Sequence, residues 1–517
     1  MNAPWNAYCA EAIGVPWLLD AIAPSGALGR RARQRERTFR PGDEAVARAA
    51  LERVDRLARE HDAASLATLR ATIGAAPDPG AALVRARAGG VLGDVDFFEL
   101  QRFAGALAAA GLLPAQSVLR ERLAPGGTND RTFYLADAFD AGLAAARAEA
   151  AARQAAYDTA RSGLAARVAH YAGVESVRDG EFVLMRDRLR GPLPAEIRVL
   201  REFPTYLLCE ISLDDDALAA LTARDAATAR VAQAEEDVRA RLSAFVAAEA
   251  EGLERASDAL GDLDMLVARA QFVQTYACVV PEVVDTPTLG FVDARHLPLA
   301  LALEQHGRRY APISLDLEGM GVVTGPNMGG KTAALRTLGF LAACVALGVP
   351  VPAAEARLPL FEEIVWLGIG AAALEDGLLS SFGAEVVTLR SFLDRQAARP
   401  LVLVDEFART TSPREGRALL VALLETLEQR GALGLAATHL AQVTAAGSHF
   451  AIGGLRELPP RDGPPLELEA ALRRIAQAMD YRLRRVSGDS GAPGDAIALA
   501  DALGLDAELI ARAKEHL

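Results

Sequence analysis

The stretch Gly321-Val-Val-Thr-Gly-Pro-Asn-Met-Gly-Gly-Lys-Thr332 joins a short apolar run to a glycine-rich turn that ends in lysine and threonine. The glycines have no Cβ atom to hold the backbone away from an anion, so successive N–H groups and the start of a following helix can face a triphosphate. Lys331 would then reach the β- and γ-phosphates, and the hydroxyl of Thr332 would bind Mg²⁺. The pattern therefore predicts a nucleotide-binding loop between a strand and a helix.

The scarcity of lysine supports this interpretation. Lys331 and Lys514 are the only lysines among the 55 basic residues, and all the others are arginine. A compact ammonium group is thus kept at a position where the planar fork of an arginine would not fit.

Length and composition predict a large, mainly helical protein of several domains. The 517 residues exceed what one hydrophobic core usually organises, so we expect three or four domains or lobes. Hydrophobic residues make up 51% of the chain and aromatic residues only 5%, which favours long helices rich in alanine, leucine and arginine over β-sandwiches.

Cysteine usage, hydropathy and charge predict a soluble cytoplasmic protein. The four cysteines are scattered without metal-type spacing, as expected of reduced thiols. The chain has no leader-like start and no apolar run of 18 or more residues, so we expect no membrane partner. The net charge of -13 argues against extensive non-specific nucleic-acid binding. The arginine-rich stretch 30–40 could form a local basic surface, although a solvated linker or an intrachain salt-bridge face is the favoured interpretation.

The pattern along the chain predicts three parts. Apolar patches broken by prolines indicate a small helical N-terminal module over residues 1–85, for which the sequence shows no chemistry. We expect a helical core and lever domain over 86–280, with a small, strand-rich, clamp-like insert at 176–211. Residues 281–517 should form one α/β unit with a parallel sheet, in which the strand candidates are 321–324, 364–368, 401–404 and 433–437.

Two proline-free segments predict long helices. Residues 134–173 indicate one long amphipathic helix, either continuous or broken once near Gly163, and residues 213–280 indicate another. These helices could act as levers that carry motion between distant sites, or they could form a structural coiled-coil stalk, and periodicity does not separate the two. A further segment, 91–112, has the pattern of a buried core helix.

Two carboxylates after a second apolar run predict the other half of a hydrolysis site. The segment Leu401-Val-Leu-Val-Asp-Glu406 places Asp405 and Glu406 at the end of a buried strand, and ligands bind at that edge of an open parallel sheet. Asp405 would hold Mg²⁺, and Glu406 would orient and deprotonate the attacking water.

Three further polar residues are candidates for the same site. His439 ends the apolar run that begins at Leu435, from where it could reach the γ-phosphate or the attacking water; a packed or surface histidine is equally expected. Ser380 and Ser381 precede a helical stretch over 386–393, where serines can cap the helix or bind phosphate.

Four motifs resemble the ATPase domain of the MutS family. In chain order they are Gly325-Pro-Asn-Met-Gly-Gly-Lys-Thr332, Ser380-Ser-Phe-Gly-Ala-Glu385, Asp405-Glu-Phe-Ala-Arg-Thr-Thr-Ser412 and Ala437-Thr-His439. Tyr310-Ala-Pro is similar to the family's segment that stacks on adenine, and 481–517 is similar to its C-terminal dimerisation region. The resemblance is closest over 250–517, extends over 90–250 and is absent from 1–85.

The resemblance implies an α/β P-loop ATPase domain of the ABC type, preceded by a mainly helical core and lever domain. ATP and Mg²⁺ are then the ligands. The nucleotide-binding residues that it implies are Tyr310, Gly325, Pro326, Asn327, Met328, Gly329, Gly330, Lys331, Thr332 and Ala333. It also implies a composite site in a homodimer, or in a heterodimer with a MutS-like paralogue, where Ser380 or Ser381 acts on the partner's nucleotide. ATP binding would close the dimer, and the long helices would transmit the closure.

The sequence departs from the family pattern at several points. Ala408-Arg-Thr-Thr-Ser412 stands where the family has Gly-Arg-Gly-Thr-Ser, and Glu415 stands where it has Asp, which bears on the geometry and rate of hydrolysis. We expect no mismatch-reading domain, because Phe97-Phe-Glu99 imitates the Phe-x-Glu signature but lies in the apolar pattern of a buried helix. The DNA-embracing clamp is reduced to the insert at 176–211.

Two functions from different classes follow from these features. In the first, the protein is an ATPase that clamps DNA or a branched nucleic acid without reading mismatches, as family membership favours. In the alternative, closure acts on a protein client: some short MutS-like proteins are associated with reactivation of a cobalamin-dependent lysine aminomutase. The acidic balance and the reduced clamp favour this alternative somewhat. A degenerate ATPase that binds nucleotide as a structural switch is a weaker third interpretation.

Overall fold

The computed structural model describes residues 3–112, 115–125, 132–177, 181–189, 191–326, 330–368, 381–440, 443, 447–455, 468–486 and 496–516. The chain divides into two compact units. Met1–Gly74 and Gly261–Leu517 together form the first unit, and Ala75–Leu260 form the second. The predicted boundaries after residues 85 and 280 differ from this division, because the N-terminal helices pack against the α/β part instead of forming a module of their own.

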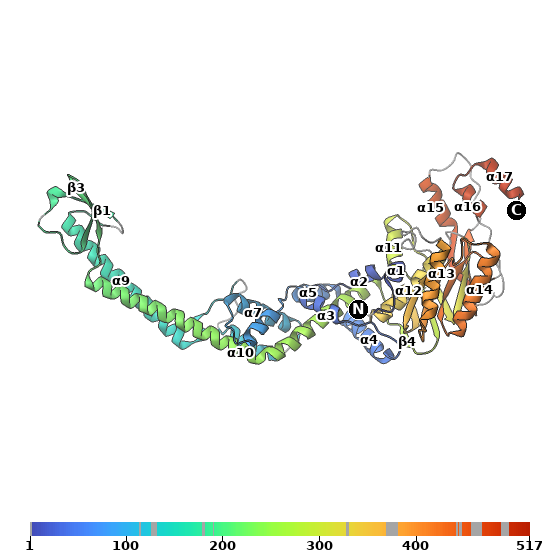
Figure 1. Cartoon of the computed structure of the whole chain (residues 1–517), viewed down its shortest axis with the longest axis horizontal. Helices are drawn as coiled ribbons and strands as arrows, with labels where there is room; N and C mark the ends of the chain where they lie inside the picture. Colours follow the sequence, from blue (N-terminus) through green and yellow to red (C-terminus); the bar gives the residue numbers. More distant parts are fainter. Residues whose placement is uncertain are drawn as a thin grey trace. The chain divides into compact units, whose positions relative to one another are not determined.

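A six-stranded sheet with the order β13-β12-β7-β11-β10-β9 lies at the centre of the first unit (Figure 1). Strands β12, β7, β11, β10 and β9 are parallel, and β13 pairs antiparallel with β12 at one edge. The strands are β7 (Met320–Thr324), β9 (Glu363–Leu367), β10 (Pro400–Asp405), β11 (Leu433–Thr438), β12 (Ser448–Leu455) and β13 (Met479–Arg485). The four strands predicted from the sequence are confirmed as β7, β9, β10 and β11, with ends that differ by at most one residue.

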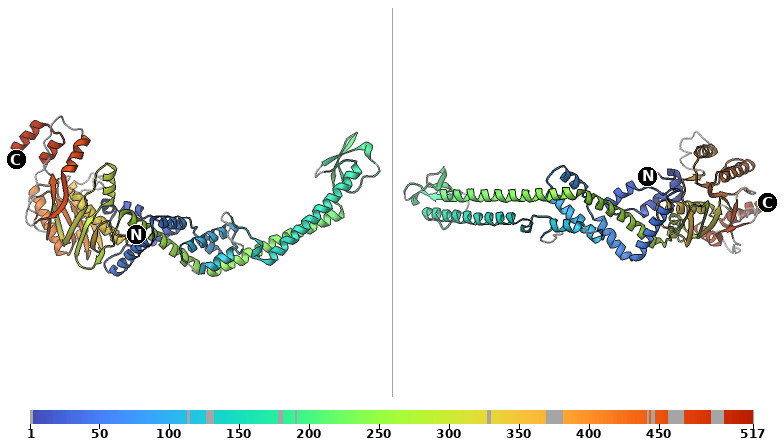
Figure 2. Two further views of the ribbon diagram at one scale, coloured as in Figure 1. Left: turned by 180° about the vertical axis from the view of Figure 1, so that it is seen from behind. Right: turned by 90° about the horizontal axis from the view of Figure 1, so that it is seen from below.

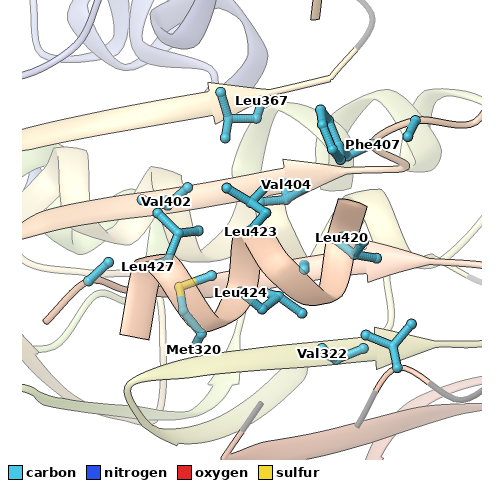
Figure 3. Packing of buried hydrophobic residues seen from close by; sticks show 14 of the residues in the cluster. Met320, Val322, Leu367, Val402, Val404, Phe407, Leu420, Leu423, Leu424 and Leu427 are labelled. Atoms are coloured by element: carbon cyan, nitrogen blue, oxygen red, sulfur yellow. The ribbon is translucent and has the colours of Figure 1, made fainter. Parts of the chain in front are cut away.

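Helices cover both faces of this sheet, which explains why its central strands are apolar along their whole length. On one face, a Cβ atom at Gly339 of α12 (Lys331–Ala346) would overlap both Leu403 of β10 and Ile13 of α1 (Ala7–Ile13). On the other face lie α13 (Ser381–Asp394) and α14 (Pro413–Gln429). Figure 3 shows leucines of α14 packed on valines of β7 and β10; the labelled residues of this core include Val322, Val402, Val404, Leu420, Leu423, Leu424 and Leu427.

A second sheet of the first unit has the order β4-β8-β5-β6. Its strands are β4 (Glu282–Val284), β5 (Thr288–Ala294), β6 (Ile313–Glu318) and β8 (Glu355–Pro359), and α11 (Leu297–Gln305) lies between β5 and β6 in the chain. The C-terminal helices of the unit are α15 (Leu468–Ala478), α16 (Ala496–Ala502) and α17 (Ala507–Glu515).

The N-terminal helices of the first unit are α1, α2 (Val15–Ala21), α3 (Ala27–Arg35), α4 (Glu44–Glu60) and α5 (Ala63–Gly74). They are tied to the rest of the unit by polar and aromatic contacts. The buried carboxylate of Asp264 accepts hydrogen bonds from Ser25 N at 3.0 Å, Ser25 Oγ at 2.7 Å and Gly26 N at 2.7 Å. The ring of Trp17 contacts Phe272 and Phe340, with centroids 6.3 and 6.2 Å apart. Residues 1–74 are therefore part of the core that carries α12.

Long helices dominate the second unit (Figure 2). They are α6 (Gly80–Arg87), α7 (Asp94–Ala109), α8 (Ala115–Leu123), α9 (Ala141–Ala172) and α10 (Asp215–Tyr276), with a 3-10 turn at Asp137–Phe139. Helix α9 confirms the predicted long helix and runs unbroken through Gly163, so of the two forms expected the continuous one is found. Helix α10 has 62 residues, and its last turns belong to the first unit. Phe97 is fully buried on α7, as expected of a core helix.

Ion pairs show that α9 and α10 run antiparallel beside each other. Arg147 contacts Glu235 at 2.7 Å, and Arg230 contacts Glu149 at 2.7 Å, so later residues on one helix meet earlier residues on the other. No helix among the described residues is both long and apolar enough to cross a lipid bilayer.

The predicted β insert is a three-stranded antiparallel sheet with the order β1-β3-β2. The strands are β1 (Glu181–Met185), β2 (Ile197–Glu202) and β3 (Tyr206–Ile211), with a 3-10 turn at Arg186–Arg188. One face packs on α9: Leu184, Leu207 and Cys209 share a core with Leu164 and Val168.

Candidate nucleotide-binding site

The predicted phosphate loop connects β7 to α12. Gly325 and Gly330 have φ angles of 151° and 98°, which favour glycine over residues with a side chain. A Cβ at Gly325 would also lie 3.1 Å from the Cβ of Ile452. Gly330 is the residue that precedes the first turn of α12 and has no side chain to cap that turn, so the amides there can bind an anion. Asn327, Met328 and Gly329 lie outside the described residues.

Lys331 is almost fully buried, with 4% of its surface exposed. Its Nζ donates hydrogen bonds to the carbonyl oxygens of Gly325 at 2.9 Å and Pro326 at 3.2 Å, and it lies 3.7 Å from Glu406 Oε1. Burial lowers the pKa of Lys331, and the neighbouring carboxylates of Glu406 and Asp405 oppose this shift. The ammonium group of Lys331 is therefore stabilised inside the loop by its contacts with carbonyl and carboxylate oxygens.

Thr332 and Asp405 meet across the end of β11, which lies between β7 and β10 in the sheet. The hydroxyl of Thr332 donates to Asp405 Oδ1 at 3.0 Å and approaches Oδ2 at 3.3 Å. Burial raises the pKa of Asp405, and the hydrogen bond from Thr332 lowers it. A hydroxyl and a carboxylate at this distance match the oxygen ligands that Mg²⁺ prefers, so the pair fits the predicted metal.

Glu406 lies on the turn that follows β10, and this turn is strained. Glu406 and Ala408 have φ angles of 51° and 61°, values that residues other than glycine rarely adopt. The amide of Glu406 donates to the carbonyl oxygen of Ala437 at 3.0 Å, and its carboxylate contacts Arg409 at 3.2 Å. The backbone thus turns the carboxylate toward Lys331 at the sheet edge.

His439 directly follows β11, so it lies at the same edge of the sheet, and its side chain is exposed. Ser381 begins α13, while Ser380 and the side chain of Ser381 are not among the described parts of the chain. The structure therefore brings Lys331, Thr332, Asp405 and Glu406 into contact, whereas His439 is near this group by position only.

A cavity of about 510 Å³ opens beside the phosphate loop. Gly330 and Ala333 at the start of α12 line it together with Tyr310, Tyr481 and Leu303. The hydroxyl of Tyr310 is hydrogen-bonded to Thr337 of α12 at 2.7 Å, which fixes the ring at this wall. The volume and the mixed aromatic and apolar lining suit a small ligand such as a nucleoside.

Two parts of the site were missed in the sequence. Glu385 of α13 has no role predicted from the sequence, but its buried carboxylate accepts a hydrogen bond from Ala408 N at 2.8 Å. Tyr8 lies in the region where the sequence showed no chemistry. Burial raises the pKa of Tyr8, and the negative charge of Asp405 raises it further, so α1 lies close to the carboxylates. No sequence signal announces either contact, since both depend on tertiary packing.

Residues 321–453 match the protein-family model described as MutS domain V. Over this segment the chain is similar to MutS-family proteins. The matched segment of this family runs from β7 into β12 and includes Lys331, Thr332, Asp405, Glu406 and His439.

Curated relatives in the MutS family agree with this assignment. Endonuclease MutS2 of Gemmatimonas aurantiaca is 35% identical over 270 residues, which cover 51% of this chain and 30% of the relative. Endonuclease MutS2 of Carboxydothermus hydrogenoformans is 31% identical over 271 residues, or 51% of this chain and 32% of the relative. Endonuclease MutS2 of Geobacillus thermodenitrificans is 35% identical over 224 residues, or 43% and 28%. The matched region thus spans less than a third of each relative.

Proposed function

We propose that this protein binds ATP with Mg²⁺ and hydrolyses it to ADP and phosphate in a P-loop site of the ABC type. The observation that supports it most is the cluster of Lys331, Thr332, Asp405 and Glu406 at the carboxyl edge of a parallel sheet. Two cation-binding oxygens, one buried ammonium group and one further carboxylate are the groups that phosphoryl transfer to water requires.

Each part of the site has a role in binding. Lys331 and the amides at the start of α12 hold the phosphates, and Asn327, Met328, Gly329 and Ala333 complete the loop. The cavity lined by Tyr310 and Tyr481 holds the adenosine. Thr332 and Asp405 hold Mg²⁺, which when bound neutralises charge on the β- and γ-phosphates.

Glu406 acts as the general base in hydrolysis. It accepts a proton from water while the water oxygen bonds to the γ-phosphorus and the bond from that phosphorus to the β–γ bridging oxygen breaks. ADP leaves with the bridging oxygen, and the proton passes from Glu406 to solvent or phosphate. His439 orients the γ-phosphate or the attacking water from the end of β11.

The site is completed by a second subunit, either another copy or a MutS-like paralogue. Ser380 or Ser381 at the start of α13 contacts the partner's nucleotide, and residues 481–517 supply the dimerisation region. Exposed leucines support the dimerisation role of residues 481–517, because apolar side chains at a surface favour contact with a partner: Leu503, Leu505 and Leu509 are 37%, 49% and 53% exposed.

The base assignment is tested by Glu406→Gln. An amide cannot take the proton from water, so we expect ATP binding to be retained and turnover to fall by about 100-fold or more. The variant should accumulate as an ATP-bound dimer, as measured by nucleotide binding, phosphate release and light scattering.

Two comparison variants accompany this test. Glu425→Gln changes an exposed glutamate of α14 and should leave turnover unchanged. Lys331→Ala should lose nucleotide binding itself, because it removes the buried ammonium group. Normal turnover in Glu406→Gln would show that another group is the base.

DNA is the client that family membership favours, and the MutS2 relatives are named as endonucleases, enzymes that cut nucleic acid. On this proposal, duplex or branched DNA stimulates ATP hydrolysis, and binding weakens steeply with salt as phosphate contacts release counterions. ATPase assays with and without DNA at two salt concentrations test it. An unchanged rate together with no salt-sensitive DNA binding would exclude DNA as the client.

The β insert favours a protein client as a second candidate. Two of its described arginines are paired with glutamates: Arg186 contacts Glu202 at 2.7 Å, and Arg198 contacts Glu210. On the strand at its edge, Val183 and Met185 are 46% and 41% exposed. Neutralised arginines beside exposed apolar side chains suit a protein surface better than a phosphate backbone.

A further inference from the structure

Glu385 of α13 is a buried carboxylate whose bonding is incomplete. Only 4% of the residue is exposed. One oxygen, Oε2, accepts the hydrogen bond from Ala408 N at 2.8 Å. The other, Oε1, is buried and has no hydrogen-bond partner within the described residues. An unsatisfied buried oxygen costs about 1–3 kcal/mol of stability, so stability alone does not explain the burial of this carboxylate.

Glu385 holds the strained backbone turn that carries Glu406. Both Glu406 and Ala408 are in the left-handed region without being glycine, and such residues persist only where the surroundings hold them. Within the described residues, two backbone amides of this turn donate to other elements: Glu406 N donates to Ala437 O at 3.0 Å on β11, and Ala408 N donates to Glu385 on α13. Arg409 on the same turn contacts the Glu406 carboxylate and also lies close enough to Glu385 to act on its charge.

We propose that Glu385 is a positioning residue that aims Glu406 by fixing the Glu406–Ala408 turn to helix α13. This inference rests on the proposed ATPase function and deepens it. Helix α13 begins at Ser381, one of the two serines proposed to contact the partner's nucleotide, so a shift of this helix on dimer closure would move Glu385 and with it the turn that carries the base. Hydrolysis in one subunit thereby depends on how its own α13 is engaged.

Single-turnover kinetics of three variants test this role. Glu385→Ala removes the acceptor and Glu385→Asp withdraws it by one methylene, so both should hydrolyse bound ATP about 10–100-fold more slowly, the loss expected from a misplaced catalytic group. Glu385→Gln keeps a carbonyl oxygen for Ala408 N and should recover most of the rate. ATP affinity should stay within about threefold of the unchanged protein for all three, because none of the variants alters the phosphate loop.

A double variant separates positioning from general damage to the fold. In the Glu406→Gln background the base is already absent, so adding Glu385→Asp should cause no further loss of the residual rate. The exposed Glu425→Gln serves as the matched control and should behave as the unchanged protein in every assay.

The outcomes distinguish this inference from the function on which it rests. If the unchanged protein neither binds nor hydrolyses ATP, the proposed function fails. If it does both and Glu385→Asp hydrolyses at the same rate, only the role of Glu385 is overturned. A parallel loss of affinity and rate, or an additive loss in the double variant, would also overturn it, since a structural defect would then explain the effect.

Discussion

At the scale of single residues, the turn after β10 shows how a departure from the family pattern is accommodated. Ala408 stands where the resemblance expects glycine, and its φ of 61° is one that glycine adopts readily. The left-handed conformation costs an alanine about 1–2 kcal/mol. Its methyl group is nevertheless 2% exposed in the apolar core beside α14, so burial offsets part of the strain.

This balance predicts the effect of Ala408→Gly. Relief of strain should nearly cancel the lost methyl burial and the added backbone freedom of the unfolded chain, so the free energy of unfolding should change by less than about 0.5 kcal/mol. Ala342 is equally buried but lies in the regular helical backbone of α12, so Ala342→Gly should lower the free energy of unfolding by about 1.5–2 kcal/mol. Urea denaturation of both variants checks this, and equal losses would show that Ala408 is unstrained.

At the scale of elements, His296 joins α11 to the N-terminal helices. It is buried at the start of α11, where Nδ1 accepts from Leu299 N at 3.2 Å and Nε2 lies 3.2 Å from the carbonyl oxygen of Ile13. A neutral ring protonated on Nε2 satisfies both contacts, whereas a protonated Nδ1 would face another donor. Burial accordingly lowers the pKa of His296 to about 4.

A pH dependence of stability follows. Between pH 6.5, the ordinary pKa of histidine, and about 4, the unfolded chain binds a proton that the folded chain does not, so stability falls as pH falls. The free energy of unfolding that this histidine removes by pH 4 approaches about 3 kcal/mol. Denaturation at pH 7 and pH 4.5 should show a smaller difference for His296→Asn than for the exposed His516→Asn control. Identical pH dependence in the two variants would contradict the assignment.

At the scale of the whole molecule, the two compact units differ in character. The first contains the parallel sheet and the candidate site, and the second consists of long paired helices that end in a small sheet. Because α10 belongs to both units, its last turns, with Phe272, lie in the same aromatic group as Trp17 and Phe340 of α12. All three rings belong to the first unit, and the lever action stays a prediction.

A composite site predicts that activity depends on protein concentration. The ATPase rate per chain should rise over the range where light scattering shows conversion from one chain to two. Leu509→Asp, which places a charge on an exposed apolar position of α17, should move both transitions to higher concentration. The same change at Leu200, an exposed leucine of the β insert, should leave them in place. A constant rate per chain across the monomer range would argue against a shared site.

The sequence made most of the first unit's sheet predictable, but not the packing around it. Strands β7, β9, β10 and β11 are predictable because apolar runs and turn residues are local signals. Lys331 and Asp405 are predictable because one follows β7 after the glycine-rich turn and the other ends β10. The sequence left open whether the helix breaks at Gly163, and it does not, since a single glycine in a helix costs only about 1 kcal/mol, which packing easily overcomes. The place of residues 1–74 could not be foreseen, because their contacts come from residues far away in the chain.

The sequence by itself determined which groups the candidate site contains: a glycine loop, a lysine, a threonine and two carboxylates at the end of an apolar strand. These groups can be recognised because their residue types and their spacing from turn residues are local properties of the sequence. Only the tertiary structure decided that Glu385 holds the turn of Glu406, that Tyr310 and Tyr481 face one cavity, and that α1 lies beside Asp405. These contacts join residues from different elements, and their formation depends on the packing of the whole unit rather than on any local pattern.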